Sequence, residues 1–288
     1  MRTASPVRLV RDAQTGMRRS ALRRQLHAVV AGKPGRLALD LDNTRLDVAA
    51  VIEEITSGRS MQSAPVQRLV VAFKGNGAAD GVVERLAAKS PQQRAQSARI
   101  VGALRMYEAV PWVVELLNSR DRSVADAAAR ALGRIGGTSA TRALTKAINR
   151  KGLNRRLVAE LSRAAPDLFI ETALGEPQPQ SVRPALAIAA GLRRRRAAVG
   201  PLIALLQNGS RRERVISCRA LGWIGAGSAV PVMVLALQDK DWKIRMSAAK
   251  ALGTLRAREA KHDLKYLTID RNARVRKAAQ FALGQLSR

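Results

Sequence analysis

The sequence predicts an all-α fold, a right-handed α-α superhelix in which about eight helix pairs stack as a solenoid. Alanine-rich runs end repeatedly in Ala-Leu-Gly, and the glycines or their equivalents recur every 29 to 31 residues. The four clearest runs are VADAAARALGRIG (124–136), VISCRALGWIG (215–225), IRMSAAKALGTL (244–255) and VRKAAQFALGQL (275–286). The composition is 47% hydrophobic but only 3% aromatic, which favours a core of small side chains between closely approaching helices.

A second apolar run opens each repeat and completes the helix pair. The runs AVPWVVELL (109–117), AVGPLIALL (198–206) and AVPVMVLAL (229–237) contain a proline near the start, where its missing N–H has no helical partner to lose. Each repeat therefore predicts a helix, a short turn and a second helix. Weaker copies place Phe73, Gly102, Ser162 and Gly191 at the glycine position. The expected repeats are 49–80, 81–108, 109–140, 141–167, 168–197, 198–228, 229–260 and 261–288.

This pattern resembles the HEAT-repeat family, in particular the short bacterial HEAT-like repeats of the phycobilisome-lyase type. The resemblance is carried by the Ala-Leu-Gly endings and by the pairs Val182-Arg183, Ile244-Arg245 and Val275-Arg276; the repeat at 109–140 departs from it with Val124-Ala125. The resemblance implies that the second helices line a concave surface. It also implies that arginines eight positions before the glycine join adjacent repeats, pairing with turn carboxylates such as Asp121, Asp239 or Asp241. These arginines are Arg94, Arg183, Arg214, Arg245 and Arg276.

Residues 1–48 do not match the repeat and form a basic N-terminal arm with a capping helix. Within the segment 17–31, Leu22, Leu26, Val29 and Val30 share one helical face, and arginines occupy the other. We expect this helix to cover the exposed first repeat, as solenoids require. The alternative is an arm that contacts nucleic acid or an anionic membrane surface.

The formal net charge of +29, from 51 basic against 22 acidic residues, predicts an acidic partner. In each second helix, the positions seven and three before the glycine and one after it lie opposite the core-facing residues. These positions form what we call the basic ridge. Its members are Arg99, Arg130, Arg134, Arg155, Arg163, Arg219, Trp223, Lys250 and Lys277. The alternatives are a solvated face for the bases and core packing between repeats for Trp223.

The sequence offers no catalytic pattern, cofactor motif or metal cluster. Iron-dependent HEAT enzymes such as deoxyhypusine hydroxylase carry His-Glu pairs, whereas Ala28 follows His27 and Asp263 follows His262. The lone Cys218 has no partnered histidine and falls in the alanine-rich core register. Together with the lack of a long apolar run, the single cysteine predicts a cytoplasmic protein.

We therefore expect a non-enzymatic scaffold that binds an acidic macromolecule, either protein or nucleic acid, through the basic ridge. Two alternatives remain open. One is a nucleic-acid-binding protein, including a DNA-glycosylase-like reading with Asp126 on the ridge near Arg130. The other is a chromophore lyase subunit of the phycobilisome type.

Overall fold

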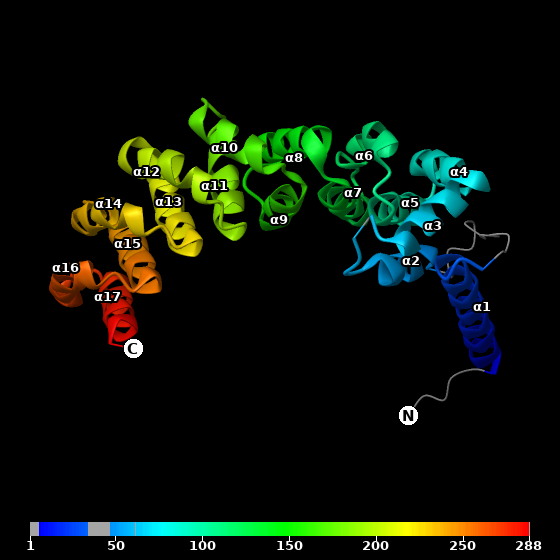
Figure 1. Cartoon of the computed structure of the whole chain (residues 1–288), viewed down its shortest axis with the longest axis horizontal. Coiled ribbons are helices and arrows are strands. Elements are labelled where there is room, and N and C mark those ends of the chain that lie inside the picture. Colours follow the sequence, from blue (N-terminus) through cyan, green and yellow to red (C-terminus); the bar gives the residue numbers. More distant parts are fainter. Residues whose placement is uncertain (1–5, 34–46, 61, 288) are drawn as a thin grey trace. The chain divides into compact units, whose positions relative to one another are not determined.

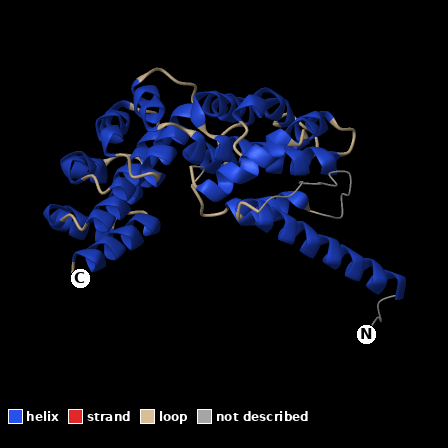
Figure 2. Ribbon diagram, turned by 45° about the vertical axis from the view of Figure 1, so that its right-hand side comes forward, coloured by secondary structure: helices blue, strands red, loops and turns tan. Residues whose placement is uncertain are grey.

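The computed structural model describes residues 6–33, 47–60 and 62–287, and throughout these ranges it contains helices and no strand (Figure 2). The expected all-α repeat fold is confirmed. The chain divides into two compact units, Met1–Ala140 and Thr141–Arg288, which we call unit 1 and unit 2. The boundary falls inside α8 (Gly137–Lys151). Across the described ranges, no helix is long and apolar enough to cross a membrane.

Unit 1 contains seven described α-helices that precede α8. They are α1 (Pro6–Val30), α2 (Val48–Thr56), α3 (Ala64–Gly75), α4 (Ala78–Glu84), α5 (Pro91–Ala103), α6 (Val110–Leu116) and α7 (Arg122–Ile135). Helices α2, α5 and α7 pack side by side in that order, and α4 and α6 cover α5 and α7 from the other layer (Figure 1).

The first expected repeat has a different internal arrangement from the others. Its second helix, α3, packs mainly on α1 and α4, whereas the neighbour of α5 in its layer is α2. The expected register, with Phe73 at the glycine position of α3, therefore does not describe this repeat. Phe73 is fully buried within the unit. Its ring needs space that is absent at the glycine position of the other repeats, because neighbouring second helices approach each other closely there.

The N-terminal helix α1 begins at Pro6, earlier than the expected segment 17–31. Its apolar face is as expected, since Leu22, Leu26, Val29 and Val30 are all buried. The helix packs on α3 and α2. Arg23 pairs with Glu54 of α2 across 2.5 Å, which ties the basic face to the same neighbour. The rest of the arm, residues 1–5 and 34–46, lies outside the described residues.

Unit 2 is a regular two-layer stack. Its helices after α8 are α9 (Arg155–Ala164), α10 (Asp167–Gly175), α11 (Val182–Leu192), α12 (Val199–Asn208), α13 (Arg211–Ile224), α14 (Val230–Leu235), α15 (Trp242–Leu255), α16 (Lys261–Tyr266) and α17 (Ala273–Leu286). Helices α9, α11, α13, α15 and α17 contact one another in sequence and form one layer. Figure 1 shows α10, α12, α14 and α16 forming the other layer on the outer side of the stack. The second helices thus share one inner face of unit 2.

The Ala-Leu-Gly endings set the close approach of neighbouring second helices. A Cβ added to Gly253 would lie 2.6 Å from the Cα of Ala282 in the next repeat. The same construction at Gly102 in unit 1 meets the Cα of Ala131, also at 2.6 Å. No side chain fits at these distances, so each glycine receives the alanine of the following Ala-Leu-Gly. The repeated tripeptide is therefore a packing device.

Candidate partner-binding surface

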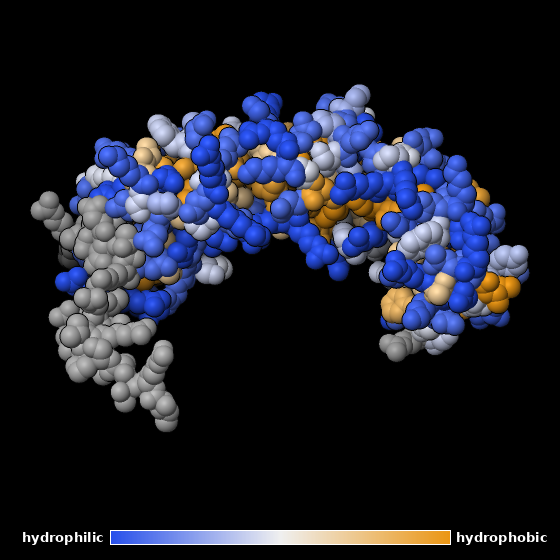
Figure 3. All heavy atoms as spheres, turned by 180° about the vertical axis from the view of Figure 1, so that it is seen from behind, coloured by the Kyte–Doolittle hydropathy of each residue, from blue (hydrophilic) through white to orange (hydrophobic). Residues whose placement is uncertain are grey.

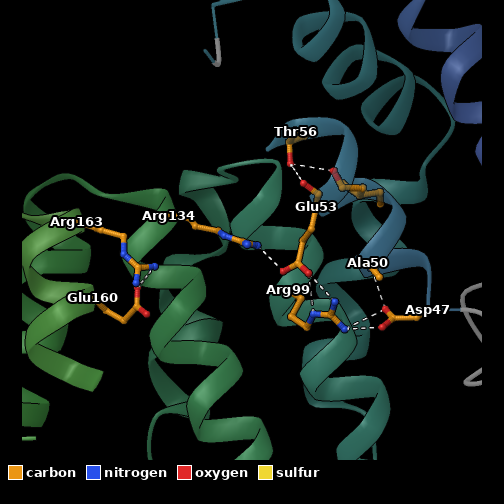
Figure 4. Close-up of polar contacts among 9 residues, drawn as sticks. Asp47, Ala50, Glu53, Thr56, Arg99, Arg134, Glu160 and Arg163 are labelled. Carbon is orange, nitrogen blue, oxygen red and sulfur yellow. Dashed lines mark hydrogen bonds and ion pairs between the residues drawn. The ribbon is translucent and has the colours of Figure 1, made fainter. Parts of the chain in front are cut away.

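In unit 1 two of the three ridge arginines are bound to carboxylates of the same unit. Glu53 of α2 lies between Arg99 of α5 and Arg134 of α7 and accepts hydrogen bonds from both (Figure 4). Arg99 also donates to Asp47 at 2.8 Å. Arg99 and Arg134 are thus engaged inside unit 1, where the sequence led us to expect contacts for a partner. Arg130 of α7 is exposed.

The Glu53 carboxyl stays ionised because of these arginines. Burial alone would raise its pKa, but the hydrogen bond from Arg99 and the charges of Arg134 and Arg99 together hold the pKa below its ordinary value. A half-buried carboxylate between two guanidinium groups is a structural link between α2, α5 and α7. Sequence reasoning missed Glu53, because it lies in the first helix of the expected repeat 49–80, whereas the basic ridge was predicted from second helices alone.

In unit 2 the ridge is exposed but interrupted. Arg155 and Arg163 lie on α9, and Arg163 pairs with Glu160 at 3.0 Å (Figure 4). The ridge positions of α11 hold Pro184, Ile188 and Leu192, so no base stands there. The series resumes on the last three second helices, whose exposed bases are Arg219 of α13, Lys250 of α15 and Lys277 of α17. In unit 2 the basic ridge therefore consists of two separate groups of bases, one on α9 and one on α13, α15 and α17.

A groove of about 640 Å³ lies along the inner face of α13, α15 and α17. Its apolar lining comes from Val215, Trp223, Met246 and Phe281, and its basic lining from Arg219 and Lys250. Trp223 is 36% exposed and Phe281 is 52% exposed. Figure 3, seen from behind the view of Figure 1, shows that patches of hydrophobic residues are exposed among the hydrophilic residues of the surface. Val215, Met246 and Phe281 occupy ridge positions, although the sequence predicted binding residues there mainly from their positive charge.

Trp223 has a packing role and an exposed edge. A Cβ on Gly191 would meet its Cε3 atom at 2.8 Å, so one side of the indole lies against α11. The guanidinium of Arg219 lies 5.2 Å from the ring centroid, a cation-π contact. The ring is therefore fixed in orientation where it borders the groove.

The arginines eight positions before the glycine donate to turn carbonyls, and three of them also pair with a carboxylate of the next repeat. Arg214 pairs with Asp239, and Arg183 reaches Glu213 at 3.3 Å. Arg245 donates to both carboxylate oxygens of Asp270, at 2.8 and 3.0 Å, and to the carbonyl of Asp239 at 2.7 Å. The hydrogen bonds from Arg245 lower the pKa of Asp270, so this pair is charged. These contacts join successive repeats of unit 2.

The two end members of this series bond to carbonyls. Arg94 donates to the carbonyls of Ala88 and Lys89, at 2.7 and 2.9 Å. Arg276 donates to the carbonyl of Asp270 at 2.8 Å. Of the carboxylates expected as partners, Asp239 takes that role and Asp241 instead pairs with Arg211. Asp121 caps α7 by accepting from the Ser123 N–H at 2.8 Å. Its hydrogen bonds from Ser123 and, more weakly, the charge of Arg94 lower the pKa of Asp121.

The side chains considered for catalysis or metal binding are Cys218, His27, His262 and Asp126. Burial raises the pKa of the Cys218 thiol to about 12, so it is protonated at neutral pH. His27 and His262 are exposed, and the described residues contain no group of three or more His, Cys, Asp or Glu side chains arranged to hold a metal. Asp126 of α7 is paired with Arg122, four residues earlier, at 3.9 Å.

Several solved structures are similar to the chain at low sequence identity. No curated protein matches the sequence. Among solved structures, human deoxyhypusine hydroxylase is similar at 19% identity, over 83% of this chain and 96% of its own, with a TM-score of 0.38. An engineered protein is similar at 18% identity, over 95% and 96%, with a TM-score of 0.38. The Escherichia coli protein YibA is similar at 12% identity, over 100% and 99%, with a TM-score of 0.43.

The sequence model of HEAT repeats matches residues 79–162 and 199–284, which together exceed half of the chain. The matched segments include Gly102 and Gly253 with their alanine contacts and four of the inter-repeat arginines, Arg94, Arg214, Arg245 and Arg276. The family expected from the Ala-Leu-Gly endings is confirmed. The chain belongs to the HEAT-repeat family.

Proposed function

We propose that the chain is a non-enzymatic scaffold whose groove on α13, α15 and α17 binds an acidic segment of a partner protein. The observation that carries this proposal is the juxtaposition of exposed aromatic rings, Trp223 and Phe281, with the bases Arg219 and Lys250 in one groove. Aromatic residues and arginine dominate the energetics of protein interfaces when they border a pocket that can be dehydrated. An acidic segment with apolar anchors complements both features.

The charge of the whole protein supports an acidic partner. The formal net charge of +29 attracts acidic surfaces and speeds their association. The groove adds selectivity, because its apolar side chains are better covered by a leucine or an aromatic side chain than by a phosphate backbone. In this division the bases orient the partner and the rings supply apolar contact area.

Single-stranded nucleic acid is the second candidate, since exposed rings beside bases can stack on nucleobases. The cation-π contact with Arg219 counts against it, because a base that stacks on Trp223 would have to displace the guanidinium, whereas an apolar side chain can contact the exposed edge of the ring. Phe281 is the remaining ring with a largely exposed surface in the groove.

The test uses a fluorescent acidic peptide that alternates glutamate with leucine and tryptophan, a poly-glutamate peptide of the same length, and a labelled thymidine oligonucleotide. Binding is followed by anisotropy. The full-length protein should bind the mixed peptide at least tenfold more tightly than poly-glutamate. Phe281→Ser, and separately the double variant Arg219→Glu and Lys250→Glu, should each weaken mixed-peptide binding tenfold or more.

The matched control is the double variant Arg258→Glu and Lys261→Glu, which makes the same change in net charge on exposed bases outside the groove. It should weaken peptide binding less than threefold. If the two double variants lost the same amount of peptide affinity, the interaction would depend only on the net charge of the protein, and the groove would be rejected as the binding site. Tighter binding of the oligonucleotide, lost in Phe281→Ser, would replace the protein partner by single-stranded nucleic acid.

A further inference from the structure

A second basic surface lies on the edge of unit 2 where first helices turn into second helices. Three consecutive turns, 209–212, 239–243 and 270–274, contribute to it. Arg212, Lys243 and Arg274 stand at successive 31-residue intervals near the starts of α13, α15 and α17. Lys240 and Arg271 are a further pair 31 residues apart. We call these five exposed residues the turn edge.

The carboxylates of the same turns face inward and are occupied. Asp239 and Asp270 have side chains 9% and 7% exposed, held by Arg214 and Arg245. Asp241 is 18% exposed and paired with Arg211. The accessible charge of the turns is therefore positive, although their sequences contain acids. A local count of charges along the sequence understates the positive potential of this edge.

Trp242 organises the cations of the turn edge. The Lys243 ammonium lies 5.6 Å and the Arg274 guanidinium 5.3 Å from its ring centroid. The indole thus contacts a cation from its own repeat and one from the next. Because the ring is engaged by the edge's own cations, the turn edge offers charge and no free stacking platform.

We propose that the turn edge binds the sugar-phosphate backbone of double-stranded nucleic acid without reading its sequence. Neighbouring second helices lie about 8 to 10 Å apart, so the cations repeat at that interval. Duplex DNA carries a phosphate charge about every 3.4 Å along each strand, which gives every cation of the row a phosphate within reach. Backbone contacts of this kind position a protein on a duplex and carry no sequence information.

An anionic membrane is the competing occupant, and the exposed side chains disfavour it. Surface binding to a bilayer relies on apolar side chains that enter the headgroup region. Across the three turns, which all lie within the described residues, Ile269 beside Asp270 is the one large apolar side chain that is strongly exposed. Beside Lys240 and Arg271, Tyr266 is a second exposed large side chain, and the other exposed side chains of the edge are charged or polar, as those of a phosphate-backbone surface are.

The experiment measures binding of a labelled, mixed-sequence 20-base-pair duplex to the nuclease-treated, full-length protein across a range of salt concentrations. The triple variant Arg212→Gln, Lys243→Gln and Arg274→Gln should bind at least tenfold more weakly at 0.1 M salt. Its plot of log affinity against log salt should be shallower by about 2.7, since each lost phosphate contact removes about 0.9 from the slope. Far-UV circular dichroism checks that helicity is unchanged.

A charge-matched triple variant outside both the turn edge and the groove, Arg258→Gln, Lys261→Gln and Lys265→Gln, should change duplex affinity less than threefold. Equal losses in the two triples would overturn the proposal in favour of a diffuse field. An unchanged edge variant would also overturn it. Vesicles containing phosphatidylserine complete the test: edge-dependent vesicle binding without duplex binding would assign the surface to a membrane. The peptide measurements use the groove variants, so the two proposals fail independently.

Discussion

Unit 1 and unit 2 carry arginines at the same positions of their second helices, yet those arginines do different things. In unit 1, Arg99 and Arg134 converge on Glu53 and link three helices. In unit 2, Arg219 stands beside the ring of Trp223 at an open groove. The repeat register fixes the direction in which a side chain leaves its helix. Whether the charge is then available depends on whether another helix brings a carboxylate to it, as α2 does in unit 1.

The largest difference we expect concerns the inter-repeat arginines. Arg245→Gln in unit 2 should lower the free energy of unfolding by about 3 kcal/mol, because it leaves the carboxylate of Asp270 in a poorly hydrated site without its counter-charge. Arg94→Gln in unit 1 should cost about 1 kcal/mol, since Arg94 donates to carbonyls that water can also reach. Urea denaturation followed by circular dichroism measures both.

The same measurement on Asp270→Asn separates the two contributions of Arg245. This variant keeps the arginine and its carbonyl contacts but removes the opposing charge. A loss as large as that of Arg245→Gln would assign the stability to the ion pair. Equal effects of Arg245→Gln and Arg94→Gln would contradict the comparison, because they would make the carboxylate irrelevant.

A smaller effect is expected at the junction of α2, α5 and α7. Glu53→Gln should lower the free energy of unfolding by about 1 to 2 kcal/mol at pH 7, because Glu53 is only partly exposed and serves two guanidinium groups. The folded state lowers the pKa of Glu53, so its contribution is present above the ordinary value of 4.5 and disappears as the pH falls through the lowered value. The wild type and the variant should therefore converge in acid.

Glu54→Gln is the matched control one residue along the same helix. Its pair with Arg23 is solvent-exposed on both sides, so the loss should stay below about 0.5 kcal/mol. A pH-independent difference between wild type and Glu53→Gln would show that the carboxylate acts through packing and not through its charge.

The parts of the molecule that the sequence predicted are those built from contacts between equivalent positions. The Ala-Leu-Gly ending predicted helices in close contact, and Gly102 and Gly253 have the same distance to their alanines in different units. Leu22 and Leu26 followed from helical spacing alone. The helix contacts and the buried face of α1 depend on the spacing of residues along the chain and on side-chain size, and both can be read from a single sequence.

What could not be predicted depends on contacts between non-equivalent positions. Glu53 meets Arg99 and Arg134 from 46 and 81 residues away, and no repeat relates them. The irregular placement of α2 and α3 goes together with the packing of α1 on both helices, a contact outside the array. The groove was missed for another reason: Met246 and Phe281 share the ridge register, but a search for charge does not select them.

The smallest expected effect concerns a strained position that both units share. Arg105 in unit 1 and Arg194 and Arg256 in unit 2 follow their helices with positive φ, at 47°, 51° and 51°, where the equivalent Gly225 has a φ of 81°. A left-handed conformation costs a non-glycine residue about 1 kcal/mol. Arg256→Gly should therefore raise the free energy of unfolding by about 0.5 to 1 kcal/mol, and Arg105→Gly by a similar amount, measured as a rise in the thermal midpoint. Gly225→Ala is the reverse control and should lower the thermal midpoint.

Because the strain belongs to the backbone, Arg256→Gly in unit 2 and Arg105→Gly in unit 1 should have similar effects. This contrasts with the arginines of the two units whose roles depend on a nearby carboxylate. If Arg256→Gly lowered the stability, the guanidinium of Arg256 would make contacts that contribute more than the backbone strain costs.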